Sequence, residues 1–82
     1  MIRKFTQTVE AIQVKPNLAN ITEIQRFATW WLWGWNRNSL DLRDARGCIN
    51  VPPGGWIVRD KMKRCIAIQT DEEFRRYYTE AK

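Results

Sequence analysis

The sequence predicts a small α+β domain: an antiparallel sheet of about five strands, one helix after the first strand, and a short C-terminal helix. Three observations lead to this prediction. Alternating or β-branched runs recur along the chain, helix-capping patterns occur at two places, and the connections are too short for parallel crossovers. The 82 residues predict a single domain, 1–82, because domains usually run to about 100–200 residues.

The first strand is expected over residues 4–14, where β-branched residues partly alternate with polar ones, and Pro16 should end it. A helix follows, with Asn20 as its N-cap and Glu23 in the capping-box position. Gly34 is the expected end of this helix. Its apolar face is predicted from residues at steps of three and four, namely Ile21, Ile24, Phe27, Ala28 and Trp31.

Four further strands are predicted beyond this helix. Residues 39–43 alternate and return through a turn at 44–47 into residues 48–51. Pro53 and Gly54 suit the two central positions of a type II turn. Residues 56–59 and 64–69 then read as a hairpin around 60–63.

The C-terminal helix begins after Thr70, which can cap it while Glu73 completes the capping box. Acidic residues 71 and 72 suit the positive end of the helix dipole. Phe74 and either Tyr77 or Tyr78 are expected to pack this helix against the sheet.

Composition excludes several classes of function. The absence of histidine removes Ser-His-Asp and Cys-His catalysis and imidazole-ligated zinc. No phosphate loop, metal-ligand cluster or acid/base pair of carboxylates stands out, so we expect no enzyme, no metal and no cofactor. No signal peptide is apparent, and the most apolar stretch, 27–35, is far shorter than a membrane span, which predicts a soluble chain.

Cys48 and Cys65 are too few for a disulfide scaffold. We expect two reduced, buried thiols, since free cysteine is among the most buried residue types. One cross-strand disulfide between them is the alternative.

Five tryptophans exceed what so small a core can easily bury. Trp31 continues the apolar helix face and Trp56 lies in a predicted strand, so both are expected in the core. On a continuing helix Trp30 and Trp33 would lie together on another face, with Trp35 after the helix end. Exposed indoles suit stacking on bases, contact with a protein partner, or packing between subunits, and these three uses stay open.

Cations near these tryptophans favour an anionic partner. The formal net charge is +5, and Trp35, Asn36 and Arg37 place an indole, an amide and a guanidinium side by side. The predicted hairpin carries four cations against the single carboxylate of Asp60; they are Arg59, Lys61, Lys63 and Arg64. An ordinary solvated basic turn is the alternative interpretation of this hairpin.

Much of the chain resembles a group of small proteins of tailed bacteriophages. Residues 51–58, VPPGGWIV, are similar to the group's V-x-P-G-D-[WY]-[IL]-[IV] strand, and Phe74 and Tyr78 keep the F-x-x-x-Y spacing of its last helix. Residues 9–13 and 20–24 are similar to its first strand and first helix. Gly55 departs from the pattern, which usually has aspartate there, and the tryptophan run and the basic hairpin are not part of it.

The resemblance implies a phage accessory protein acting in the cytoplasm of an infected bacterial host. Taken with the surplus tryptophan and arginine, it leads to the hypothesis of a non-catalytic counter-defence or host-takeover protein. The protein would sequester a nucleotide-derived signal, an anionic small molecule, in a Trp/Arg-lined site, and is expected to form a homo-oligomer. The site residues predicted are Trp30, Trp33, Trp35, Asn36, Arg37, Arg59, Lys61, Lys63 and Arg64. The alternatives are an inhibitor that blocks a host protein through its tryptophans, and a nucleic-acid-binding module.

Overall fold

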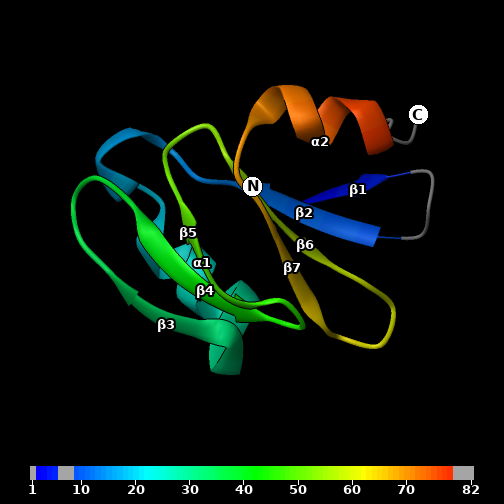
Figure 1. Ribbon diagram of the computed structural model, residues 1–82, viewed down its shortest axis with the longest axis horizontal. Helices are drawn as coiled ribbons and strands as arrows, with labels where there is room; N and C mark the ends of the chain where they lie inside the picture. The colour runs from blue at the N-terminus through cyan, green and yellow to red at the C-terminus, as the bar shows by residue number, and fades with distance from the viewer. Residues whose placement is uncertain (1, 6–8, 79–82) are drawn as a thin grey trace.

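Two antiparallel sheets and two helices form the fold of the computed structural model, which describes residues 2–5 and 9–78 (Figure 1). Sheet A has the order β1-β2-β6-β7, with strands Arg3–Phe5, Val9–Gln13, Trp56–Arg59 and Cys65–Ile68. Sheet B has the order β3-β4-β5, with strands Leu32–Trp35, Leu40–Asp44 and Gly47–Val51. The α+β class is confirmed, whereas the single sheet of about five strands is wrong.

Helix α1 (Ile21–Ala28) follows β2, and helix α2 (Asp71–Tyr77) lies near the C-terminal end, as predicted. Short 3-10 turns precede and follow α1, at Pro16–Leu18 and Thr29–Trp31. No helix in the described ranges is long and apolar enough to cross a membrane.

The N-terminal region forms a hairpin in place of the one long strand expected over 4–14. Strands β1 and β2 pair antiparallel, with Phe5 opposite Val9. Residues 6–8 of the expected strand lie outside the described residues. A period-two pattern is the same whether a chain runs straight or turns back, so the sequence pattern did not reveal the reversal.

Helix α1 ends at Ala28 and not near Gly34, because Thr29 leaves the helical conformation with φ 44° and ψ −104°. Residues Leu32–Trp35 then pair with β4 as strand β3. Aromatic residues favour strands, and a ladder of hydrogen bonds to β4 outweighs continuation of the helix. The expected helical Trp30/Trp33 pair is therefore wrong.

Strand β6 in the middle of sheet A is buried on both of its faces. Ile57 joins the larger core between the sheets and α1, while its neighbours Trp56 and Val58 join a second core under α2. Phe74 stacks on Trp56 with ring centroids 4.0 Å apart, and Tyr78 stacks on Phe74 at 5.1 Å. The packing expected of α2 is confirmed for Phe74 and Tyr78, whereas Tyr77 is exposed.

The two predicted helix caps have different outcomes. The Thr70 hydroxyl accepts from Glu73 N at 3.1 Å, which confirms Thr70 as the N-cap of α2. The Asn20 side chain makes no cap bond to α1; it accepts from Lys15 N and donates to Gln13 O, at 3.2 and 2.8 Å. Asn20 is therefore used to close the preceding loop and not the helix end.

The turn between β5 and β6 has the predicted geometry. Gly55 N donates to Pro52 O at 3.0 Å, and Gly54 adopts a positive φ of 94°, as the third residue of a type II turn requires. A Cβ atom on Gly55 would lie 2.5 Å from Val51 Cγ1 and 2.8 Å from Ile68 O. A side chain at this position therefore has no room unless these neighbours shift.

Candidate ligand-binding site

The tryptophans divide into buried and exposed sets, as expected. Trp56 is buried and Trp31 is partly buried against the larger core. Trp30, Trp33 and Trp35 are 91, 63 and 49 % exposed. Three indoles therefore face solvent, and their use in binding stays a prediction.

Trp33 has a cationic neighbour that sequence reasoning missed. Arg43 on β4 places its guanidinium carbon 5.2 Å from the centroid of the Trp33 ring. A stacked guanidinium and indole attract each other through the negative face of the ring. In the sequence, Arg43 is marked only as the last polar residue of the alternating segment 39–43. In the structure its side chain is exposed.

The β6–β7 turn is organised by Asp60. Its carboxylate Oδ1 accepts from Met62 N and Arg64 N at 2.9 and 3.0 Å, and its backbone oxygen accepts from Lys63 N at 3.0 Å. The Arg64 guanidinium lies 3.7 Å from the same carboxylate. The predicted hairpin is confirmed, and the carboxylate of Asp60 is largely used within it.

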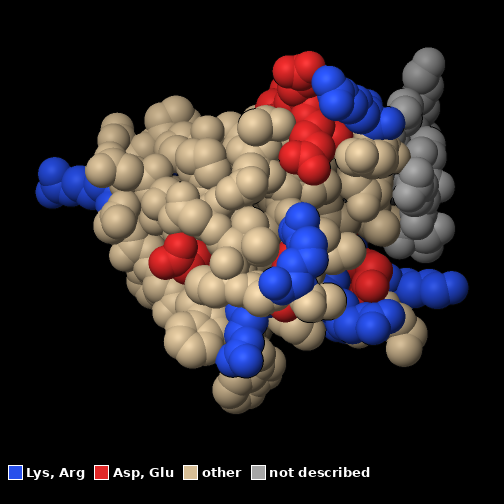
Figure 2. Space-filling model, in the orientation of Figure 1, with Lys and Arg blue, Asp and Glu red and all other residues tan. Residues whose placement is uncertain are grey.

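A pocket of about 380 Å³, here called the large pocket, lies between the β6–β7 turn, the 3-10 turn Thr29–Trp31 and the end of β4 with the turn that follows it. This volume falls within the range of small-molecule sites. Figure 2 shows basic side chains gathered over the lower part of this view, where Figure 1 places the β6–β7 and β4–β5 turns, while the largest acidic cluster lies over α2. The pocket is lined by Trp31, Arg43, Asp44, Ala45, Asp60, Arg64, Cys65 and Ile66.

Asp44 in this pocket is occupied by its own protein partners. Its buried carboxylate accepts from Arg46 N at 2.8 Å, from the Arg46 guanidinium at 2.6 Å and from Ala67 N at 3.2 Å. The Arg46 guanidinium also donates to Ala67 O. The backbone N–H and C=O of Ala67, on the edge strand β7, therefore both have hydrogen-bond partners. Burial raises the pKa of Asp44, but the hydrogen bonds from Arg46 and Ala67 outweigh it and hold the pKa below its usual value.

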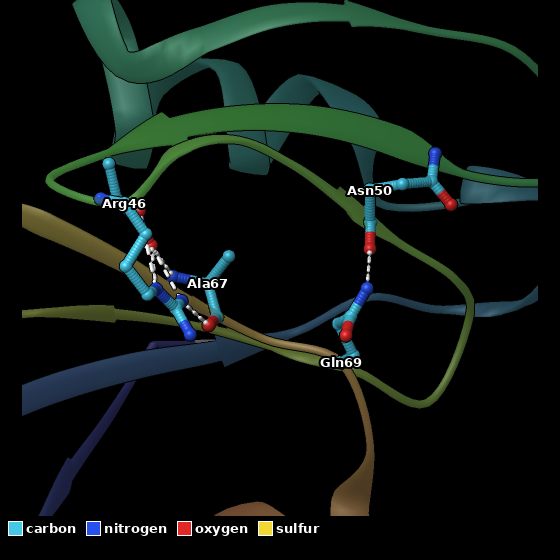
Figure 3. A network of polar contacts seen from close by, with 5 residues as sticks. Arg46, Asn50, Ala67 and Gln69 are labelled. Atoms are coloured by element: carbon cyan, nitrogen blue, oxygen red, sulfur yellow. Dashed lines mark hydrogen bonds and ion pairs between the residues drawn. The ribbon is translucent and has the colours of Figure 1, made fainter.

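These contacts join the two sheets beside the pocket. Figure 3 shows the guanidinium of Arg46 against the backbone of Ala67 and, farther along, Gln69 pointing at Asn50. Gln69 Nε2 donates to Asn50 O at 2.9 Å. The lining carboxylates, Asp44 and Asp60, accept several hydrogen bonds from the protein itself. Arg43 and Arg64 are exposed, so their guanidinium groups can still donate to a ligand, Arg64 beside its ion pair with Asp60.

Cys65 forms part of the pocket wall, but its thiol is a poor nucleophile. Burial raises the pKa of Cys65 to about 11, with the charge of Arg59 opposing the shift and that of Asp60 adding to it. The thiol is protonated at neutral pH. Cys48 is exposed on β5, so the expected burial is wrong for this residue, and the two thiols are free and form no disulfide.

A smaller pocket of about 190 Å³, here called the small pocket, adjoins Trp31. It brings together the end of α1, the first two tryptophans and two of the predicted hairpin cations. The residues that line it are Phe27, Ala28, Thr29, Trp30, Trp31, Arg59 and Lys63. The structure therefore places Trp30, Arg59, Lys63 and Arg64 of the predicted site around Trp31, while Lys61 lines neither pocket.

Trp35, Asn36 and Arg37 belong to the other end of β3 and line neither pocket. The Asn36 side-chain oxygen accepts from Asn38 N and Ser39 N, at 2.7 and 3.1 Å, so it closes the β3–β4 loop. The predicted site is thus split along β3, because a strand of four residues spans about 13 Å.

The described residues contain no group of three or more cysteine, aspartate or glutamate side chains that could hold a metal ion. No family model, curated protein or solved structure matches the chain.

Proposed function

We propose that this protein is a non-catalytic binding protein that sequesters a nucleotide-derived ligand in the large pocket. One observation supports this function: the indole of Trp31 and the guanidinium groups of Arg43 and Arg64 line the same pocket of about 380 Å³. The phage resemblance implies an accessory protein made in an infected bacterium, and the sequestered ligand that we propose for it is a signal used in host defence.

The chemistry of the pocket suits a planar base joined to phosphate. Stacking of a base on an aromatic ring contributes about 1–3 kcal/mol. Guanidinium groups bind phosphate oxygens in a fixed, bidentate geometry. The high pKa of Cys65 and the occupied carboxylates favour binding over reaction.

Calorimetric titration with nucleoside mono- and diphosphates tests the proposal. Arg43→Gln and Arg64→Gln should each weaken binding by about tenfold or more, since a hydrogen bond to a charged group contributes about 1.5–3 kcal/mol. Arg37→Gln is the matched control: it removes the same charge from an exposed arginine outside both pockets, and affinity should stay within about twofold.

Absence of heat with every nucleotide, or an equal loss in all three variants, would contradict the pocket assignment. Titration of a single-stranded oligonucleotide in rising salt addresses the nucleic-acid alternative, for which affinity falls steeply with salt. In infected bacteria, the wild-type protein should protect phage from a nucleotide-signalled defence, and Arg64→Gln should not.

A second candidate function is supported by the exposure of Trp33 and Trp35 on β3, an edge strand of sheet B. Exposed aromatic residues are the common anchors of protein interfaces. In this case the protein would block a host protein. A stoichiometric partner recovered from host lysate by the wild type, and lost with Trp33→Ala and Trp35→Ala, is the expected result; retention by both variants would exclude these residues as anchors.

A further inference from the structure

The two pockets share a common wall. Trp31 lines both the large and the small pocket. The consecutive residues Lys63 and Arg64 of the β6–β7 turn also line one pocket each, Lys63 the small and Arg64 the large. The two pockets are therefore linked by one shared ring and by two cations that are consecutive in the chain.

The small pocket has the same two kinds of chemistry as the large one. Three aromatic side chains line it, those of Phe27, Trp30 and Trp31. Arg59 lies 4.3 Å from the Phe27 ring centroid and is held by Glu10 at 2.8 Å, which fixes this cation as part of the wall. Lys63 is exposed, which leaves its ammonium group accessible to an anion.

We propose that the ligand carries two bases joined through phosphate, a dinucleotide, with one base in each pocket and the linkage over Lys63 and Arg64. This inference rests on the proposed function and specifies its ligand class. A mononucleotide would leave one aromatic pocket empty, whereas a second stacked base adds about 1–3 kcal/mol, equivalent to about 5- to 150-fold in affinity.

The experiment compares adenosine monophosphate with linear and cyclic diadenylate, and the corresponding guanine compounds, by calorimetry on the full chain. At least one dinucleotide should bind about tenfold or more tightly than its mononucleotide, with one ligand per chain. Trp30→Ala and Lys63→Gln should lower dinucleotide affinity by about fivefold or more and change mononucleotide affinity by less than about twofold.

Trp30 and Lys63 are both exposed, so these variants are expected to fold, which a circular dichroism spectrum checks. Lys61→Gln removes the same charge from the same turn outside both pockets and should leave all affinities unchanged.

Three results would overturn the two-pocket assignment while leaving the proposed function intact: equal affinity for mono- and dinucleotides, one dinucleotide per two chains, or an equal effect of Lys61→Gln and Lys63→Gln. Binding of no nucleotide would overturn both.

Discussion

Asp44→Asn tests the contact that joins the two sheets beside the large pocket. The Asp44 side chain is 2 % exposed and receives donors from the backbone and guanidinium of Arg46 and from Ala67 N. An asparagine keeps the size and one oxygen, but it removes the charge and turns an NH₂ group toward at least one of these donors. The substitution therefore changes hydrogen bonding without creating a cavity.

The expected loss of stability follows from the burial of each partner. Removing one member of a fully buried ion pair costs about 3–5 kcal/mol, whereas exposed pairs contribute about 0–1 kcal/mol. Arg46 is 55 % exposed and stays hydrated in the variant, so we expect an intermediate loss of about 2–3 kcal/mol. In a domain of this size that loss lowers Tm by about 10–20 °C.

The assay is urea and thermal unfolding followed by circular dichroism, with Asp41→Asn as the matched control. Asp41 is on the same strand, and its bond from Asn50 Nδ2 can be kept by an amide oxygen. The control should lose less than about 0.5 kcal/mol. An Asp44→Asn protein as stable as the control would refute the role given to this contact.

The pH dependence of stability independently checks that the fold lowers the pKa of Asp44. The pKa of Asp44 is lower in the folded chain than its usual 3.8. The contribution of the ionised carboxylate to the free energy of unfolding is therefore complete above pH 3.8 and is lost as the pH falls toward the folded pKa. The difference between wild type and Asp44→Asn should therefore stay constant from about pH 7 to pH 5 and shrink below about pH 4. A difference that grows on acidification would contradict this account.

Three further predictions concern single positions. Gly55→Asp should lower stability by at least about 1–3 kcal/mol in urea unfolding, since any Cβ overlaps Val51 and the backbone of β7; a neutral result would contradict the crowding. At pH 8 iodoacetamide should modify exposed Cys48 rapidly and Cys65 only on unfolding, as read by mass spectrometry, and rapid double labelling would contradict the burial of Cys65 and its pKa of about 11. Thr70→Ala should cost about 0.5–2 kcal/mol in the same unfolding assay, and no change would mean that the cap bond contributes nothing.

The parts of the fold that sequence reasoning predicted well depend on neighbouring residues. The Thr70 cap, the turn at Pro53 and Gly54, and the hairpin around 60–63 each involve bonds between residues a few positions apart. Local side-chain and backbone preferences are strong enough to decide such features.

The parts that sequence reasoning missed depend on strand pairing. The sequence pattern of residues 32–35 is compatible with a helix or with a strand, and pairing with β4 selects the strand. Asn20 has the chemistry of a cap, yet Gln13 and Lys15 take its side chain. The division into two sheets likewise depends on which strand edges meet.

The sequence identified several residues of the candidate site, but it did not show which of them lie together in the folded chain. The exposed tryptophans and the hairpin cations were identified from composition and charge, while Arg43 and the use of Trp31 as a shared wall were not. Trp35, Asn36 and Arg37 are adjacent to this site in sequence but are separated from it by the length of β3.

The sequence by itself determined the α+β class, the surplus of tryptophan over core capacity, the absence of histidine chemistry and the positions of the turns. These follow from composition and from interactions within a few residues. Only the tertiary structure decided that Trp31 and Arg64 line one pocket and that Arg37 does not, because the packing of two separate sheets sets distances between residues far apart in the chain.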